Sequence, residues 1–378
     1  MSSISRLFYR TYCTATATPT ASIRSLSNEL FKERNLKRVV EKFKQFSNSD
    51  RFRDKTGIYD STVRRLASAK RFKSIEEILE YQKQFKHDFS KEGFPVRLIT
   101  LYGKSRMFDH AQKVFDEMTE NNCGRTVNSM NALLAAAVKS RKFDQMEELF
   151  NELPVKYNIR PDVVSYNTVI KGLCEMGSLD QSISMICEME KSGLKPDLIT
   201  FNTILYSLYS NNRFDDGEKI WSQMLERKLV PNIRTYNARL VGLVNEKRVQ
   251  EATELVGVLE NKNLKADVFS YGTLIKAYGM EGNLEEVKRW YEKMIENKCD
   301  PDKLVFWSVI SSASEKGDFD WAYEVCKDIF KWNCNVDVQI LQKVVDGLVK
   351  ESKIEEAKQV VHLGQSRRYT KLKLPTDA

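Results

Sequence analysis

Asparagine recurs at a fixed interval along this chain of 378 residues. Four of its amides are spaced by 35 or 36 residues: Asn131, Asn167, Asn202 and Asn237. A side-chain amide carries hydrogen-bond donors and an acceptor, so it can pair with the edge of a nucleobase. Asn is also a poor residue for the interior of a helix, because its amide competes for backbone hydrogen bonds. The spacing therefore indicates a repeated function for the amide.

The elements that must position these amides follow a hydrophobic repeat of the same length. With Val163 as place 1, Asn falls at place 5, place 4 is aromatic or Met, and places 8, 17 and 27 are apolar. Places 4, 8 and 11 share one helix face, and places 17, 20, 24 and 27 share a second. Turn-tolerant residues separate the two faces near place 15: Gly177, Asn212, Gly282 and Gly317. Each repeat therefore predicts two helices joined by a short turn.

Stacked helical pairs are the predicted fold, because one pair alone cannot bury both of its apolar faces. The fold class is all-α, an α-solenoid of about nine 35-residue units. These units are 56–91, 92–126, 127–162, 163–197, 198–232, 233–267, 268–302, 303–337 and 338–372. Before them, residues 29–55 are predicted as a basic capping helix and loop, and after them residues 373–378 are predicted as a tail. Several units end in Pro-Asp or Pro-Asn, where Pro stops one helix and the Asx side chain caps the next.

The stretches "VVSYNTVIKGLCEMG" and "GLKPD" resemble the pentatricopeptide repeat family, and the uniform unit length resembles its P-type subclass. The resemblance implies a right-handed superhelix that binds RNA, with one base read by each repeat. In that family, places 5 and 35 read the base and place 2 sandwiches it. Further stretches, such as "VNSMNALLAA" and "PNIRTYNARLVGL", are similar to short P-type proteins of the plant mitochondrial ribosome's small subunit.

Carried onto this chain, the resemblance gives four candidate reading pairs. They are Asn131 with Asp162, Asn167 with Asp197, Asn202 with Asn232, and Asn237 with Asp267. In the family, Asn with Asp favours uracil, and Asn with Asn favours a pyrimidine. Val164 and Ile199 stand at place 2, whereas Gly272 and Trp307 at place 5 match no readable pair. The alternative is a framework role, since Asp near a helix start caps the helix in any case.

Positive charge gathers near the two ends of the chain. Residues 29–91 carry 17 Lys and Arg against 10 Asp and Glu, whereas residues 92–366 carry 36 against 41. The segment "VRRLASAKRFK" places Arg64, Arg65, Arg71 and Lys73 beside an aromatic residue. Such a patch can bind the phosphate backbone of RNA, and the alternative is a solvated helix face. The acidic middle supplies little phosphate attraction, so a free-standing RNA reader is disfavoured.

The first 28 residues contain three Arg and no acidic residue. This composition is typical of an organelle transit peptide, and the Arg-rich amphipathic start favours the mitochondrial matrix over the chloroplast. Arg10 and Arg24 each resemble the residue three places before a plant mitochondrial cleavage site.

Three functions remain open at the level of sequence. The first is a ribosomal component that contacts rRNA and neighbouring ribosomal proteins. The second is an autonomous factor on a pyrimidine-rich organellar transcript, and the third is a protein-binding scaffold. We expect no enzyme, cofactor, metal site, small-molecule substrate or membrane span, because the chain has no phosphate loop, no zinc motif and no long apolar run.

Overall fold

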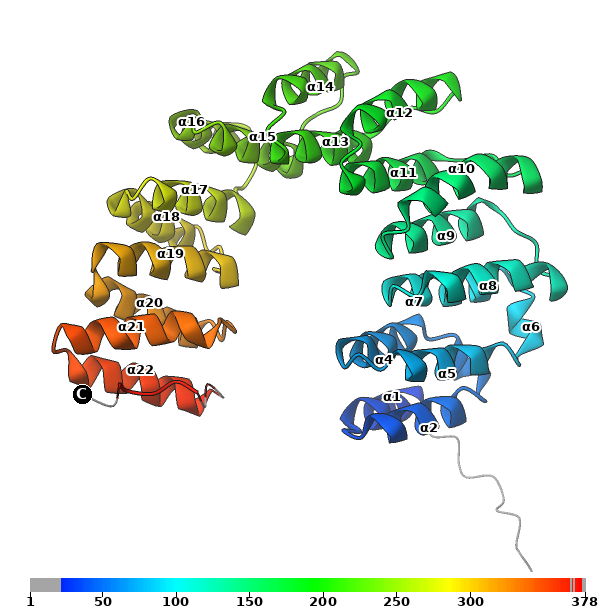
Figure 1. Ribbon diagram of the computed structural model, residues 1–378, viewed down its shortest axis with the longest axis horizontal. Coiled ribbons are helices and arrows are strands. Elements are labelled where there is room, and N and C mark those ends of the chain that lie inside the picture. Colours follow the sequence, from blue (N-terminus) through cyan, green and yellow to red (C-terminus); the bar gives the residue numbers. More distant parts are fainter. Residues whose placement is uncertain (1–21, 368, 370, 376–378) are drawn as a thin grey trace, which may run out of the picture. The chain divides into compact units, whose positions relative to one another are not determined.

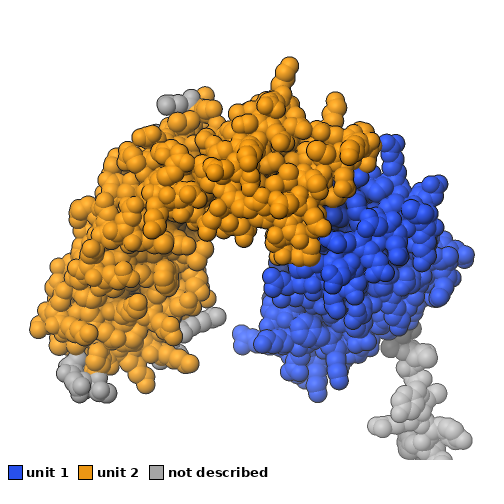
Figure 2. All heavy atoms as spheres, turned by 45° about the horizontal axis from the view of Figure 1, so that its top comes forward, with its two compact units in different colours: residues 1–172 blue, residues 173–378 orange. Residues whose placement is uncertain are grey.

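The computed structural model describes residues 22–367, 369 and 371–375, apart from the side chains of residues 260 and 261. Every regular element in these residues is an α-helix (Figure 1). The predicted leader falls mostly on residues 1–21, which lie outside the described residues. The chain divides into two compact units, residues 1–172 and residues 173–378, coloured separately in Figure 2. None of the described helices is long and apolar enough to cross a membrane.

Unit 1 begins with three helices before the repeats: α1 (Ile23–Lys32), α2 (Leu36–Phe46) and α3 (Asp50–Arg53). Its repeat helices follow in pairs, with one short helix between the first two pairs. They are α4 (Thr56–Ser68), α5 (Phe72–Gln82), α6 (Lys86–Phe89), α7 (Gly93–Lys104), α8 (Phe108–Glu120), α9 (Val127–Lys139) and α10 (Phe143–Tyr157). Helix α11 (Val163–Met176) contributes residues to both units.

Unit 2 continues the same alternation of paired helices. Its helices are α12 (Leu179–Lys191), α13 (Leu198–Ser210), α14 (Phe214–Glu226), α15 (Ile233–Asn245), α16 (Val249–Asn261), α17 (Val268–Met280), α18 (Leu284–Glu296), α19 (Lys303–Lys316), α20 (Phe319–Lys331), α21 (Val338–Lys350) and α22 (Ile354–Ser366). The first helix of each pair packs on the first helix of the next, as α13, α15, α17, α19 and α21 do in turn. The predicted all-α solenoid is therefore confirmed within each unit.

The hydrophobic repeat forms the core as the sequence predicts. Places 4, 8 and 27 are buried in every unit from 127 to 337, and Met130, Phe201 and Phe306 are 0% exposed. Place 17 is less uniform, because Leu179 and Val249 are buried whereas Phe143 and Phe214 are half-buried. The helical pairs are therefore held together mainly by places 4, 8 and 27.

A left-handed residue at place 15 makes the turn inside each pair. Positive φ angles occur at Lys70, Arg106, Arg141, Gly177, Asn212, Lys247, Gly282, Gly317 and Ser352. Sequence reasoning identified the glycines and Asn212, which adopt this conformation at low cost. Sequence reasoning did not identify the turns at Lys70, Arg106, Arg141 and Lys247, because Lys and Arg are not typical turn residues.

The N-terminal segment differs from its prediction. Helix α1 begins at Ile23, inside the predicted disordered leader, and residues 29–55 form parts of three helices instead of one capping helix and a loop. The Ser22 side chain caps α1, and Leu30 is buried at 1% exposure. Apolar contact with the following helices therefore orders this segment. At the other end, the Lys373 N–H donates to Gln342 Oε1 at 3.2 Å, and Gln342 Nε2 donates to the Lys373 carbonyl oxygen at 2.8 Å. The predicted tail therefore begins with a residue that is hydrogen-bonded to α21.

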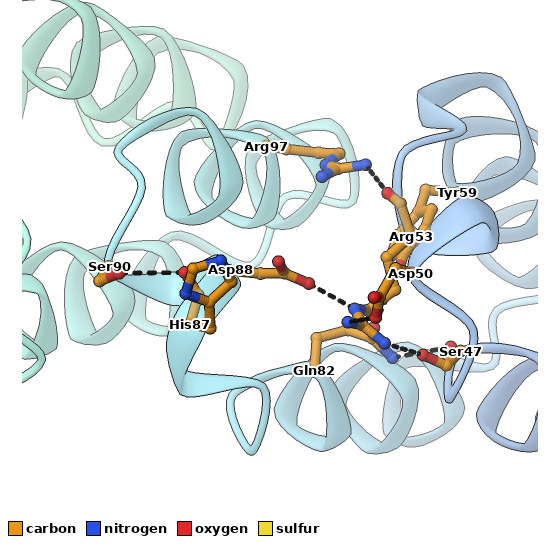
Figure 3. Close-up of polar contacts among 9 residues, drawn as sticks. All are labelled: Ser47, Asp50, Arg53, Tyr59, Gln82, His87, Asp88, Ser90 and Arg97. Atoms are coloured by element: carbon orange, nitrogen blue, oxygen red, sulfur yellow. Dashed lines mark hydrogen bonds and ion pairs between the residues drawn. The ribbon is translucent and has the colours of Figure 1, made fainter.

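A buried arginine joins the first helices of unit 1 (Figure 3). Arg53 Nε donates to Asp88 Oδ2 at 2.5 Å, and Arg53 Nη1 donates to the Ser47 carbonyl oxygen at 2.7 Å. The guanidinium also lies 3.9 Å from the centre of the Phe85 ring, and it pairs with Asp50. Arg97 donates to the backbone carbonyl of Arg53. This network ties α3 to α6 and α7.

Candidate nucleic-acid interface

The residues at place 35 cap the helices that follow them. Asp162, Asp197, Asn232 and Asp267 each accept a hydrogen bond from the backbone N–H three residues later, at 2.9 to 3.1 Å. Each N-terminal turn gains a partner for an N–H group that the helix itself leaves unpaired. The framework role that the sequence left open is therefore present for all four side chains.

In the pairs of Asn131 with Asp162 and of Asn237 with Asp267, the amide at place 5 is bound on both sides. In unit 1, Asn131 Nδ2 donates to Asp162 Oδ1 at 3.0 Å, and Asn131 Oδ1 accepts from the Ser165 hydroxyl at 2.6 Å. In unit 2, Asn237 Nδ2 donates to Asp267 at 3.0 Å, and its Oδ1 accepts from Ser270 at 2.6 Å. Sequence reasoning missed these serines, although Ser or Thr at place 3 recurs in neighbouring units.

The amide of Asn202 is the least engaged of the three whose contacts can be followed within one unit. Its Nδ2 lies 3.4 Å from Asn232 Oδ1, and its Oδ1 has no hydrogen-bond partner among the described residues. The hydroxyl of Thr235 donates to Asn232 instead, at 3.1 Å. Because Asn202 Oδ1 is also buried, the group that Asn202 keeps for a ligand in the pocket described below is an amide N–H.

The fourth pair, Asn167 with Asp197, is divided between the units. Asn167 and Val164 lie on α11 within unit 1, whereas Asp197 belongs to unit 2. Val164 is 56% exposed, and Ile199, at the same place of the next unit, is 63% exposed.

A pocket of about 520 Å³ in unit 2 brings most of the remaining predicted residues together. Its lining includes Asn202, Asn232, Asn237, Asp267 and Ile199. Arg234, Phe269 and Tyr206 complete the polar and aromatic part of the wall. Tyr206 was not predicted, although it stands four residues after Asn202 and so shares its helix face. The wall combines amides, one carboxylate, one guanidinium and aromatic rings, a set that suits a nucleobase with its phosphate.

The electrostatics of Asp162 reflect its role as a cap. Burial raises the pKa of this carboxyl, but hydrogen bonds from the Ser165 backbone and hydroxyl and from Asn131 outweigh it. The pKa of Asp162 therefore lies below its ordinary value of 3.8. At neutral pH the carboxylate is charged, and its Oδ1 already accepts from Asn131 and from the backbone and hydroxyl of Ser165.

The predicted basic patch forms a surface at the turn between α4 and α5. Arg64, Arg71 and Lys73 are exposed, and Phe72 between them is 45% exposed. Arg64 also pairs with Asp60. Arg65 differs, since its guanidinium donates to the carbonyl oxygens of Leu30, Phe31 and Glu33 at the end of α1. We call Arg64, Arg71 and Lys73 the α4–α5 basic surface, and Arg65 serves the packing of α1.

No cluster of His, Cys, Asp or Glu that could hold a metal ion occurs within the described residues. The six cysteines in that part of the chain are free, and burial raises the pKa of several of their thiols, including Cys326 to about 12.

Family models match the region that carries the repeats. The model described as the PPR repeat family matches residues 125–175, 161–210, 196–245 and 266–314. A model of the single PPR repeat matches residues 97–123. PPR stands for pentatricopeptide repeat.

Several curated proteins of Arabidopsis thaliana are similar to this chain. Small ribosomal subunit protein mS78 is 55% identical over 180 residues, which are 48% of this chain and 44% of that protein. Small ribosomal subunit protein mL103 is 30% identical over 301 residues, which are 79% of this chain and 73% of that protein. A pentatricopeptide repeat-containing protein named as mitochondrial is 42% identical over 134 residues, 35% of this chain and 32% of its own. The chain thus spans about half the length of the first relatives that it matches.

Among solved structures, the maize pentatricopeptide repeat protein PPR10 aligns with a TM-score of 0.52 at 18% identity. The alignment covers 91% of this chain and 48% of that one, and it supports the fold alone. The paired helices, the family models and the long match to mL103 agree, and this chain belongs to the pentatricopeptide repeat family.

Proposed function

We propose that this chain is an RNA-binding component of the small subunit of the mitochondrial ribosome. The observation that carries the proposal is the 55% identity to a small ribosomal subunit protein over 180 residues. The match to mL103 extends the likeness over 79% of the chain. In this role the protein contacts rRNA and neighbouring ribosomal proteins and supports mitochondrial translation by binding.

Two surfaces support contact with RNA. The α4–α5 basic surface offers three exposed cations beside Phe72 for the phosphate backbone. The pocket of unit 2 offers an amide N–H of Asn202 beside Ile199 and Phe269, a combination that suits one or two unpaired bases. Both surfaces suit the binding of folded rRNA that also exposes a short single strand.

The proposed location is the mitochondrial matrix. The Arg-rich, acid-free start of the sequence supports it, and so does the likeness to a relative named as mitochondrial. A tagged full-length chain imported into plant mitochondria tests this directly.

Sedimentation tests the proposed assembly. Mitochondria that carry the tagged protein are lysed in detergent, and the lysate is run on sucrose gradients with and without EDTA. We expect the protein to move with the small subunit, and to stay with it after EDTA separates the subunits. Migration in light fractions under both conditions contradicts the proposal.

The pocket of unit 2 favours a second candidate, an autonomous factor on a pyrimidine-rich organellar transcript. Its support is that Asn202, Asn232, Asn237 and Asp267 line one cavity. Sequencing of the RNA that is crosslinked to the protein separates the two roles. Small-subunit rRNA supports the first candidate and a messenger or precursor RNA supports the second, whereas no retained RNA favours a protein-binding scaffold.

A further inference from the structure

A groove between α8 and α10 lies wholly within unit 1. It has a volume of about 420 Å³ and separates the second helices of two successive helical pairs. We propose that this α8–α10 groove docks a short basic amphipathic helix of a neighbouring protein. This docking deepens the proposed function, on which it rests, because it gives the chemistry of one protein partner and the place where that partner binds.

The floor of the groove is apolar and comes from both helices. On α10, Leu149, Leu153 and Tyr157 are spaced by four residues, so they share one helix face, and Phe108 comes from the start of α8. Phe108 and Leu153 are buried, whereas Leu149 and Tyr157 are half-buried. The floor therefore exposes apolar surface, which the apolar face of a docked helix would cover.

Helix α10 is longer than its neighbours, and its extra residues line the groove. It has 15 residues, whereas α8 and α12 have 13 each and end at place 29 of their units. The residues of α10 beyond that place are Lys156 and Tyr157, and both line the groove. The Tyr157 ring packs on Phe115 of α8, with 6.0 Å between ring centres, and the Arg125 guanidinium lies 4.5 Å from the centre of the Tyr157 ring. These contacts hold the end of α10 to α8, so the two walls keep their spacing there.

Carboxylates stand along both walls above this floor. Asp109 and Asp116 belong to α8, Glu148 and Glu152 belong to α10, and all four are exposed. Among the described residues that line the groove, Lys156 is the only cation. Asp109, Glu148 and Glu152 make no ion pair with another described residue. The groove therefore carries negative charge that the chain itself leaves unneutralised.

The charge of the groove favours a basic protein segment over RNA or a metal ion. Carboxylates repel the phosphates of RNA, whereas they attract the Lys and Arg side chains of a protein partner. Within the part of the chain that the structure describes, these carboxylates do not form a cluster that could hold a metal ion. In unit 1, the α4–α5 basic surface thus suits RNA, and the α8–α10 groove suits a partner whose charge is opposite to that of RNA.

The length of the groove suits about three turns of helix. Its α10 wall runs from Gln145 to Tyr157, which is about 18 Å at a rise of about 1.5 Å per residue. An amphipathic helix of that length places apolar side chains three and four residues apart on the floor, and Lys or Arg side chains beside the two acidic walls.

Three fluorescein-labelled peptides of equal length and the full-length chain test the groove. The first is a designed helix with Leu on one face and Lys and Arg on the other. The second has the same residues in scrambled order, and the third is the first with Glu in place of each cation. We expect the first peptide to bind, the second to bind at least about fivefold more weakly, and the third to show no binding. Asp109→Asn, Glu148→Gln and Glu152→Gln together should weaken binding of the first peptide about tenfold.

The matched control variant carries Asp215→Asn, Glu254→Gln and Glu188→Gln. These exposed carboxylates occupy the same repeat places, 18, 22 and 26, on second helices of unit 2, and none of them lines the groove. The control should bind all three peptides as the wild type does. If both triple variants lose the same affinity, or if the scrambled peptide binds as well as the helix, the attraction is unspecific and the groove is not a docking site.

Photocrosslinking from the groove tests the docking in the assembled particle. A benzophenone amino acid replaces Gln145 in the tagged protein, the small subunit is isolated from mitochondria, and the crosslinked segment is identified by mass spectrometry. We expect crosslinks to a segment of another protein that is rich in Lys and Arg. Crosslinks to rRNA alone, or none to another protein, would overturn the docking while the ribosomal assignment stands. If the protein sediments in light fractions but binds the basic helix through the three carboxylates, the groove stands and the proposed function fails.

Discussion

At place 5 of units 127–162 and 233–267, the asparagine amide lies between the last residue of its own unit and a serine of the following unit. Its Nδ2 donates to the capping Asp at place 35, and its Oδ1 accepts from the Ser at the next place 3. Asn237 is only 7% exposed, so most of the hydrogen-bonding capacity of its amide is used in these two bonds. The amide of Asn202 lacks the second bond because its Oδ1 is buried without a partner, and only its N–H groups are placed for contact with RNA in the pocket.

Alanine substitutions should separate these two kinds of asparagine. Asn131→Ala removes two hydrogen bonds, of 3.0 and 2.6 Å, while Asp162 and Ser165 stay bonded to each other, so it should lower the free energy of unfolding by about 1–2 kcal/mol. Asn202→Ala removes one 3.4 Å contact and should cost less than about 0.5 kcal/mol. Urea denaturation followed by circular dichroism measures both. If the two variants lose the same free energy of unfolding, the two-sided bonding of Asn131 contributes nothing extra to stability.

The cap at Asp162 predicts a dependence of stability on pH. A carboxyl whose pKa is depressed in the folded state stabilises the fold above its unfolded-state pKa, and this contribution is lost as the pH falls through the folded-state pKa. Asp162→Asn keeps an acceptor at the cap, as Asn232 does naturally, but cannot titrate. The stability advantage of the wild type over the variant should therefore shrink as the pH falls from about 6 to about 3. An advantage that is constant with pH would contradict the shift.

At the scale of the helical element, the left-handed residue at place 15 fixes the turn. Gly177 has a φ of +90°, and no atom lies within 4 Å of the position that a Cβ would take. Lys247 holds the equivalent place with a φ of +58° and a side chain. A side chain at Gly177 would therefore cost free energy because of the left-handed backbone conformation, and not because of a steric clash.

Exchanging the residue types at these two turns should have unequal effects. Gly177→Ala should destabilise unit 2 by about 1 kcal/mol, because Ala resists the left-handed conformation. Lys247→Gly should change stability by less than about 0.5 kcal/mol, because relief of strain is offset by the greater freedom of Gly in the unfolded chain. Thermal denaturation of both variants and of the wild type measures these changes in stability. An unchanged melting temperature for Gly177→Ala would show that the turn does not require Gly.

The first helices of unit 1 depend on the two acidic partners of Arg53. Asp88 is the half-buried partner, with 21% of its side chain exposed, and Asp50 is the exposed one, at 87%. Asp88→Ala leaves a buried guanidinium poorly paired and should cost about 3 kcal/mol. Asp50→Ala, the matched control, should cost less than about 1 kcal/mol because its pair is solvated. Protease protection of α3 and α6, read by mass spectrometry, should fall in the Asp88 variant alone.

At the scale of the whole molecule, the basic surface and the amide pocket lie in different units. The α4–α5 basic surface belongs to unit 1, and the amide pocket belongs to unit 2. Electrostatic attraction to phosphates and contacts to bases can therefore be weakened separately by substitution.

Replacing the basic surface should change the salt dependence of assembly. Arg64→Gln, Arg71→Gln and Lys73→Gln together should release the protein from its RNA at lower salt, and should reduce the slope of log affinity against log salt by up to about 3. The control variant carries Lys191→Gln, Lys195→Gln and Lys265→Gln, which removes three exposed lysines of unit 2. An unchanged slope in the first variant would remove the α4–α5 basic surface from the binding role.

Local sequence was sufficient to determine the helical pairs of this protein. The apolar residues at places 4, 8 and 27 are buried because their spacing puts them on one side of each helix, whatever the neighbours are. The caps at Asp162, Asp197, Asn232 and Asp267 were likewise predictable, because a cap bonds to the backbone of its own next turn.

Only the tertiary structure decided how much of each side chain is left for a ligand. Asn131 and Asn202 occupy the same place in the sequence repeat, yet one amide is bound on both sides and the other has a buried oxygen without a partner. Arg64 and Arg65 are adjacent, yet one is exposed and the other binds the end of α1. These differences arise from contacts between residues 30 or more positions apart, and the packing of neighbouring units determines such contacts where the local pattern does not.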